Sequence, residues 1–150
     1  MTQLIVEKVT KQYPTLGEPL VVLRGVDLAL ASGENLAIVG PSGSGKSTLL
    51  NIIGGLDKPS SGRVIVDEEI ITSLSERELA SYRNRKIGFV FQDHHLLPQC
   101  TALENVLIPC LARGRPDRET VDWARYLLEQ VGLANRADHR PGEMSGGERQ

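Results

Sequence analysis

The segment Gly40–Thr48 constrains the fold of this chain more than any other stretch, because it reads Gly-Pro-Ser-Gly-Ser-Gly-Lys-Ser-Thr. Residues 40–47 fit the phosphate-binding loop pattern G-x-x-x-x-G-K-[ST]. The apolar run Asn35–Val39 in front of the loop predicts a buried strand, and the apolar positions behind Thr48 predict a helix. Strand, glycine-rich loop and helix, in this order, form the context in which the pattern binds phosphate.

The residue types in the loop suit an anion. Glycines allow backbone N–H groups to turn inward without Cβ clashes, and the start of the helix adds a partial positive charge. Lys46 supplies a point charge for the β- and γ-phosphates, and the Ser47 hydroxyl can bind Mg²⁺. The sequence therefore predicts a nucleotide site made of Gly40, Pro41, Ser42, Gly43, Ser44, Gly45, Lys46, Ser47 and Thr48.

Other interpretations of the loop fit less well. A glycine turn that binds nothing is the plainest alternative, but the flanking strand and helix patterns argue against it. A dinucleotide-binding loop needs a third glycine where Thr48 follows Gly43-x-Gly45. The chain also has no Asn-Lys-x-Asp stretch to select guanine. We therefore expect ATP, although the loop by itself does not choose the purine.

Composition narrows the class of protein. The 150 residues suit one domain, and a formal net charge of −2 offers no electrostatic argument for nucleic acid as a partner. No apolar run reaches the length of a membrane span, and residues 1–8 lack the apolar core of a signal peptide. Cys100 and Cys110 have no metal-binding or redox spacing, so we expect buried or half-buried thiols. These features favour the cytoplasm.

The first part of the chain alternates strand-like runs with turns. The segments 13–19 and 59–62 are rich in turn residues, and Ser75-x-x-Glu78 is a capping box that predicts a helix over 76–84. The predicted strands cover residues 4–10, 21–23, 26–30, 35–39, 63–67 and 87–91.

After Gln92 the pattern becomes helical. Thr101-x-x-Glu104 is a second capping box, and Pro109 is expected to bend or end the helix that it opens. An apolar stripe over 119–131 predicts a further helix, stopped by Gly132. Trp123 and Tyr126 lie on this helix, and we expect them to pack inside the protein.

Met144–Glu148 reads Met-Ser-Gly-Gly-Glu and is the second diagnostic run. Ser145-x-x-Glu148 is itself a capping box and could merely begin a helix. Together with the upstream loop, however, the run resembles the Leu-Ser-Gly-Gly-Gln signature of the ATP-binding-cassette (ABC) transporter ATPases, with Met144 for Leu and Glu148 for Gln. The resemblance implies an α/β fold: a P-loop NTPase core with an N-terminal antiparallel β layer and a helical subdomain, incomplete at the C-terminus. It divides the chain into residues 1–92 (β layer and core), 93–143 (helical subdomain) and 144–150 (start of the signature helix).

The resemblance also implies roles for particular residues. Tyr13 stands where the family stacks adenine on an aromatic ring, although an exposed loop tyrosine is the alternative. Gln92, after Phe89-Val90-Phe91, matches the glutamine that contacts Mg²⁺ and the attacking water, with a strand-end polar residue as the alternative. Lys46 and Gln92 would be catalytic, and Ser47 and Gln92 would bind the metal. The signature residues of a second subunit would close over the γ-phosphate: Ser145, Gly146, Gly147 and Glu148.

Shorter runs resemble one subgroup, the ATPase subunits of lipoprotein-releasing transporters, with macrolide and peptide exporters as close relatives. The runs are 54–57, 79–91, 94–98, 101–106 and 137–141. This resemblance implies a subunit that hydrolyses ATP with Mg²⁺, pairs with a second ATPase subunit and binds permease subunits at the cytoplasmic side of the inner membrane. The sequence of this subunit does not identify the transported cargo.

Two features of the segment after Gln92 have competing interpretations. His94 and His95 could suggest a metal site, but without a third ligand we expect an exposed loop pair. Leu96, Leu97 and Pro98 would contact a permease or, alternatively, pack within the helical layer.

Hydrolysis also needs a carboxylate beside Mg²⁺. The family carries it on an apolar strand after the signature, and no such run lies between Met144 and Gln150. Val64–Glu68 imitates one, but it precedes Gln92 and is expected in the antiparallel layer. We expect the 150 residues to be the N-terminal part of a longer protein and to bind nucleotide weakly without turnover. The alternatives are a non-catalytic nucleotide-binding module and a soluble ABC-type ATPase of translation or DNA repair.

Overall fold

The computed structural model describes residues 4–150, apart from the side chains of Ala112 and Arg113. Residues 1–3, which belong to the N-terminal segment that lacks the apolar core of a signal peptide, lie outside this range. The chain divides into two compact units, Met1–Gly88 and Phe89–Gln150. The division at residue 92 expected from the sequence stays a prediction.

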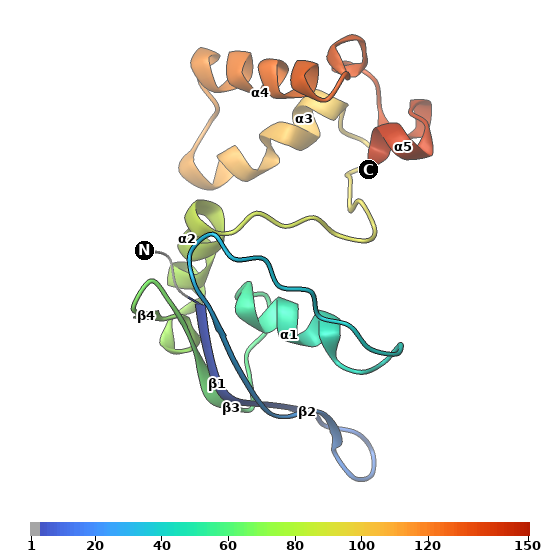
Figure 1. Ribbon diagram of the computed structural model, residues 1–150. Coiled ribbons are helices and arrows are strands. Elements are labelled where there is room, and N and C mark those ends of the chain that lie inside the picture. Colours follow the sequence, from blue (N-terminus) through green and yellow to red (C-terminus); the bar gives the residue numbers. More distant parts are fainter. Residues whose placement is uncertain (1–3) are drawn as a thin grey trace. The chain divides into compact units, whose positions relative to one another are not determined.

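An antiparallel sheet forms one layer of the first unit (Figure 1). Its strands are β1 (Leu4–Tyr13), β2 (Leu20–Leu30), β3 (Ser61–Val66) and β4 (Glu69–Ile70), in the order β2-β1-β3-β4. β1 is central, with Leu4 opposite Leu30 of β2 on one side and Val66 of β3 on the other. The run 64–66 thus belongs to the antiparallel layer, as predicted.

Two irregularities bend β1 and β2. The predicted strands 21–23 and 26–30 form one strand, because Gly25 is accommodated as an extra residue between the pairs Val9–Val26 and Thr10–Arg24. Gly25 has a φ of +86°, which suits glycine. On β1, Lys8 has a φ of +47°, and its backbone N–H bonds to Oδ1 of Asp27.

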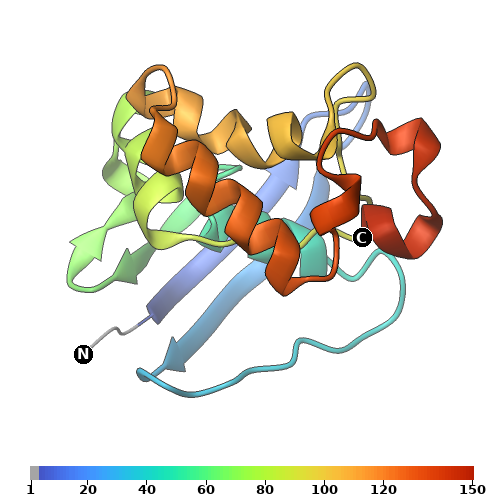
Figure 2. The ribbon, with the colours of Figure 1, turned by 90° about the horizontal axis from the view of Figure 1, so that it is seen from above.

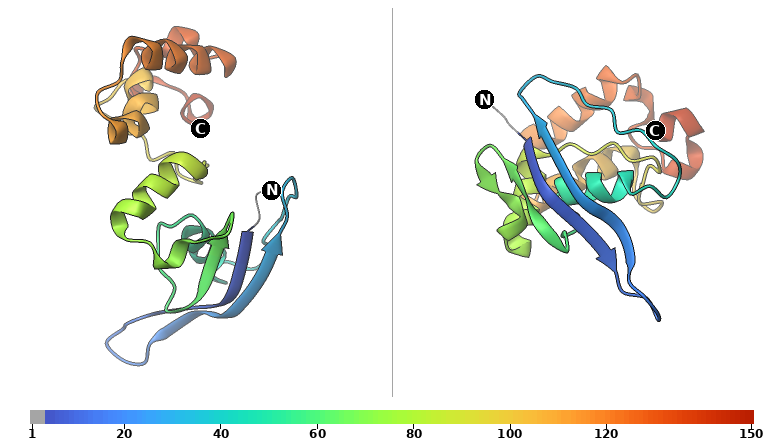
Figure 3. Two further views of the ribbon diagram at one scale, coloured as in Figure 1. Left: turned by 90° about the vertical axis from the view of Figure 1, so that its left-hand side faces the viewer. Right: turned by 60° about the horizontal axis from the view of Figure 1, so that its bottom comes forward.

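Helix α1 (Lys46–Ile53) lies against one face of this sheet (Figure 3). Its buried residues Leu49 and Ile52 belong to the same hydrophobic core as the strands. The core that they share with the strands also contains Ile71, from the short 3-10 helix Ile71–Ser73, and Tyr82 of α2 (Glu76–Lys86). The predicted capping box at the start of α2 is confirmed, since the Ser75 and Glu78 side chains each bond the other's backbone N–H. The remaining buried members of this core are Val6, Val9, Leu23 and Val64.

The predicted strands at 35–39 and 87–91 are wrong for this structure, because neither segment has regular secondary structure. A strand in a parallel sheet exists through its ladder with a neighbour, and neither segment has one among residues 4–150. Leu36, Val39 and Val90 are exposed instead of buried. Only Ile38 and Ile87 of the two segments pack against the core of the first unit, and both are partly buried.

The second unit is helical (Figure 2). α3 (Ala102–Leu107) lies alongside α4 (Arg118–Gln130), and the unit ends in α5 (Gly146–Arg149). Pro109 ends α3 as predicted, since the chain continues as the 3-10 helix Ile108–Arg113. Two more 3-10 turns follow α4, Ala134–Arg136 and Pro141–Glu143. No helix in the described part of the chain is long and apolar enough to span a membrane.

A small core joins α3, α4 and the residues before α5. It contains Ala102, Leu103, Ala124, Leu128, Ala137 and Met144. The predicted packing of Trp123 and Tyr126 is wrong: their rings stack on each other at 5.1 Å and face solvent, Trp123 being 58% exposed. α4 buries only the narrow stripe through Ala124 and Leu128, and the two aromatic residues lie beside it.

Candidate functional site

The glycine-rich loop turns through left-handed backbone conformations just before α1. Gly43 and Gly45 have φ values of +77° and +87°, and Gly45 is the residue from which α1 begins. A Cβ on Gly45 would lie 2.9 Å from Cδ2 of Leu23 and 3.0 Å from the carbonyl oxygen of Val22. Glycine is therefore required at position 45 both by backbone geometry and by the close approach of β2.

The Lys46 side chain folds back onto the first residues of the loop. Its ammonium donates to the carbonyl oxygens of Gly40 at 2.9 Å and Pro41 at 2.6 Å, so the first residue of the helix is tied to the first residues of the loop. Ser47 is exposed and Thr48 half-buried in the first turn. No acidic residue lies in that turn, which leaves the partial positive charge of the helix start uncompensated.

Tyr13, the last residue of β1, is held in a small polar network. Its hydroxyl donates to Oδ2 of Asp57 at 2.7 Å, and Lys11 donates to Oδ1 of the same carboxylate at 2.6 Å. The bond to Asp57 raises the pKa of Tyr13, while contact with the Thr48 side chain opposes this. Burial works to raise the pKa of Asp57, but bonds from Lys11 and Tyr13 outweigh it and hold the pKa below its usual value.

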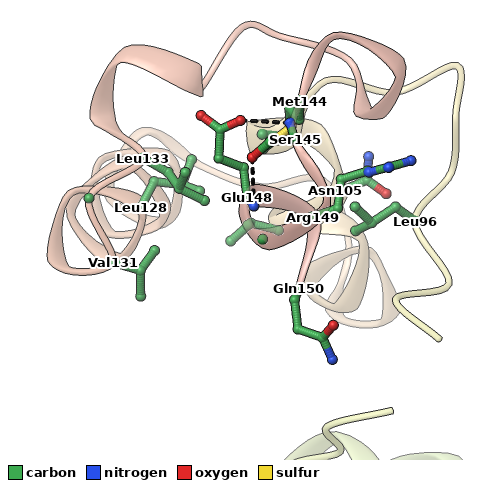
Figure 4. A pocket seen from close by; sticks show the side chains of 14 residues that line it. Leu96, Asn105, Leu128, Val131, Leu133, Met144, Ser145, Glu148, Arg149 and Gln150 are labelled. Atoms are coloured by element: carbon green, nitrogen blue, oxygen red, sulfur yellow. Dashed lines mark hydrogen bonds between the residues drawn. The ribbon is translucent and has the colours of Figure 1, made fainter. Parts of the chain in front are cut away.

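The signature segment forms a tight capped turn in the second unit (Figure 4). The backbone N–H of Ser145 donates to Oε2 of Glu148 at 2.7 Å, and that of Glu148 donates to Oγ of Ser145 at 3.3 Å. The predicted capping box is thus confirmed. Met144 is buried in front of it, whereas Ser145, Gly146 and Gly147 are exposed, so the turn is anchored on one side and open on the other.

Glu148 makes one further contact, which the signature motif does not predict. Nε of Arg136 donates to Oε1 of Glu148 at 2.7 Å. The bond from the Ser145 backbone, followed by that from Arg136, lowers the pKa of Glu148 to about 2. Beside this turn lies a cavity of about 660 Å³. Its lining combines residues of the signature segment with apolar side chains from the loop before α3, from α3, and from α4 and the turn that follows it, among them Leu96, Leu128 and Leu133.

Gln92 begins an exposed loop, and Asn105 of α3 stabilises the end of this loop by hydrogen bonds to its backbone. The Asn105 side chain accepts from the N–H of Leu97 at 2.8 Å and donates to the carbonyl oxygens of Leu97, Cys100 and Thr101 at 2.9 to 3.2 Å. His94 and His95 are exposed, and the ring of His95 meets that of Phe91 edge-on at 4.9 Å. Cys100 and Cys110 are free, half-buried thiols, as predicted.

The predicted site residues divide between the two units, and among the described residues the structure shows a contact between Tyr13 and the loop but none between Gln92 and the signature turn. Tyr13 and the loop 40–48 belong to the first unit, where Tyr13 contacts Thr48. Gln92 and Ser145–Glu148 belong to the second unit. The sequence analysis did not predict roles for Lys11, Asp57, Asn105 and Arg136. The contacts of Lys11 with Asp57 and of Arg136 with Glu148 join residues 46 and 12 positions apart, whereas Asn105 bonds within eight positions, to a loop whose conformation the sequence does not specify.

The first group offers an anion-binding loop beside an exposed aromatic ring, an arrangement that suits a nucleotide. No cluster of three or more His, Cys, Asp or Glu side chains that could hold a metal occurs in the described range.

Three comparisons place the chain among known proteins. The family model described as ABC transporter matches residues 23–150. A lipoprotein-releasing system ATP-binding protein, LolD 1 of Rhodopirellula baltica, is 57% identical over 98% of this chain and 64% of its own length. The LolD of Myxococcus xanthus is 48% identical over 100% of this chain and 67% of its own.

Among solved structures, the dimeric ATP-binding cassette MJ0796, in a post-hydrolysis state bound to ADP and Pi, superposes with a TM-score of 0.89 at 43% identity, covering 97% of this chain and 65% of that one. The chain thus spans about two thirds of the length of the proteins that it matches. Motifs, fold and these similarities agree: the chain belongs to the ABC transporter family.

Proposed function

We propose that this chain is the nucleotide-binding portion of a transporter ATPase subunit, in which the loop 40–48 binds the phosphates of ATP. The observation that carries the proposal is the loop geometry. Gly45 opens α1 in a left-handed conformation, and Lys46 stands at the helix start with its ammonium at the loop carbonyls. A similar cassette has been solved with ADP and Pi.

In this proposal each group of residues has a role. Lys46 neutralises the β- and γ-phosphates, and backbone N–H groups of residues 43–48 surround them. Tyr13 supports the adenine. Ser47 and Gln92 would hold Mg²⁺, which would spread the charge of the phosphates. Gln92 orients the attacking water.

The signature turn would serve a second copy of the subunit. Ser145, Gly146 and Gly147 present exposed backbone at the start of a helix, which suits the γ-phosphate of a nucleotide held by a partner. Glu148 shapes the turn. A solved neighbour is described as a dimeric cassette, which supports pairing of two ATPase subunits. Residues 1–92 would form the β layer and core, 93–143 the helical subdomain and 144–150 the start of the signature helix.

The similarity to LolD proteins supports a role in lipoprotein release at the cytoplasmic side of the inner membrane. Permease subunits would be the partners, and the exposed loop that begins at Gln92 would be in position to contact them. Purified complexes of the complete subunit with its permeases would test this role by ATP-dependent release of a lipoprotein from proteoliposomes.

Calorimetric titration with ATP and Mg²⁺ tests the nucleotide site itself. We expect Lys46→Ala in the protein expressed from its complete reading frame to abolish ATP turnover and to weaken binding. Lys86→Ala is the matched control, because that ammonium pairs with Asp67 and not with the loop. Undiminished turnover in Lys46→Ala would reject the assignment of the site.

A further inference from the structure

Tyr13 is an exposed ring whose orientation is set by its neighbours. The side chain is 37% exposed at the end of β1, where the hairpin loop to β2 begins. A tyrosine at a strand end is free to rotate unless its hydroxyl is held. Here the hydroxyl bonds to Oδ2 of Asp57 at 2.7 Å, across 44 positions of sequence.

Asp57 is in turn fixed from three directions. Its Oδ1 accepts from Nζ of Lys11 at 2.6 Å and from the backbone N–H of Lys58 at 2.7 Å. Its own N–H bonds to the carbonyl oxygen of Asn51 in α1 at 3.2 Å. The carboxylate that holds Tyr13 is thereby attached to the helix whose first residue is Lys46.

Lys11 completes the network and is nearly buried, at 9% exposure. It lies two residues before Tyr13 on β1, so both side chains are on the same face of the strand. Nζ also donates to the carbonyl oxygen of Lys58 at 2.6 Å and sits 4.8 Å from the centre of the Tyr13 ring. A cation over one face of the ring leaves the opposite face for a stacking partner.

We propose that Asp57 and Lys11 are positioning residues that hold the Tyr13 ring for the purine base of a nucleotide whose phosphates lie in the loop 40–48. The inference rests on the proposed function, because it presumes that the loop binds a nucleotide. Asp57 links the ring to the helix that follows the loop, so base and phosphate contacts share one rigid support. Neither Asp57 nor Lys11 contacts the nucleotide.

The test separates base binding from phosphate binding by comparing ATP with inorganic tripolyphosphate, which has no base. Both Kd values are measured by calorimetry in the protein expressed from its complete reading frame. Tyr13→Phe keeps the ring and removes only the hydroxyl that bonds to Asp57. Tyr126→Phe on α4 is the control for the loss of a phenol hydroxyl at another site. We expect Tyr13→Phe to weaken ATP binding about threefold to tenfold, the worth of one net hydrogen bond, and to leave tripolyphosphate binding unchanged.

Substitutions of the two positioning residues extend the test. Asp57→Asn and Lys11→Met should weaken ATP binding and spare tripolyphosphate, whereas Lys11→Arg, which keeps the ion pair, should restore affinity for ATP. The inference is overturned if Tyr13→Phe binds ATP normally while Tyr13→Ala binds it weakly. The ring would then support the base without the hydrogen bond from its hydroxyl to Asp57. Equal losses for both ligands overturn it as well, since the substitutions would have disturbed the loop. A protein that binds neither ligand rejects the proposed function first.

Discussion

Nε of Arg136 donates to Oε1 of Glu148 at 2.7 Å, while Oε2 of the same carboxylate accepts from the backbone N–H of Ser145, also at 2.7 Å. One side chain thus links the 3-10 turn Ala134–Arg136 to the start of α5. Glu148 therefore takes part both in the local capping box of the signature turn and in a contact with a residue twelve positions earlier in the chain.

The first prediction concerns the ionisation of Glu148. Its pKa is lowered to about 2 from an ordinary 4.5, so its contribution to stability is complete above about 4.5 and is lost as the pH falls toward 2. We expect the carboxyl resonance of Glu148 to keep its ionised shift at about pH 3.5, where an ordinary glutamate is mostly protonated. Arg136→Gln should move the midpoint upward. Glu129→Gln on α4 is the control, and a wild-type midpoint near 4.5 would contradict the ion pair.

The second prediction concerns the sheet. A Cβ on Gly62 would lie 2.4 Å from the carbonyl oxygen of Lys8, and Gly62 has a φ of +85°. We expect Gly62→Ala to lower the free energy of unfolding by about 2 kcal/mol or more, because backbone must move to admit the methyl group. Gly17→Ala, with nothing within 4 Å, should change it by less than about 0.5 kcal/mol. Equal urea midpoints for the two variants would show that β1 and β3 do not approach in this way.

Local signals predicted local structure well. The capping boxes at Ser75, Thr101 and Ser145 were all confirmed, because a cap and its partner lie three residues apart and need nothing else. The left-handed turn at Gly45 follows in the same way from the loop pattern. The family and the α/β character with an antiparallel layer could be predicted too, since the motifs occur in a fixed order along the chain.

Properties that depend on distant partners could not be predicted. The run Asn35–Val39 is apolar enough for a buried strand, but a strand requires a neighbour, and the described residues provide none. The hydrogen bonds that Asp57 accepts from Lys11 and Tyr13 join residues more than 40 positions apart in the sequence. Charge and spacing in the sequence give no signal for such contacts, although the site depends on them.

The third prediction tests the corrected placement of Trp123, the only tryptophan of the chain. Because its ring is 58% exposed and stacks on the ring of Tyr126, we expect fluorescence emission typical of indole in water and strong quenching by iodide. Tyr126→Ala should increase the quenching further. A blue-shifted emission that iodide does not reach would instead support the packing expected from the sequence.

The last prediction compares two adjacent leucines on α4. Leu128 is 5% exposed in the small core with Ala102 and Met144, whereas Leu127 is 41% exposed. Leu128→Ala should lower the free energy of unfolding of the second unit by about 2–4 kcal/mol, through lost burial and the cavity left behind. Leu127→Ala removes the same atoms from the same helix, so its helix propensity change is identical, and we expect a loss below about 1 kcal/mol. Urea unfolding followed by Trp123 fluorescence measures both, because the tryptophan lies on α4 itself. Equal losses would mean that α4 packs through a wider face than the stripe of Ala124 and Leu128, and the exposed position of Trp123 would then be wrong as well.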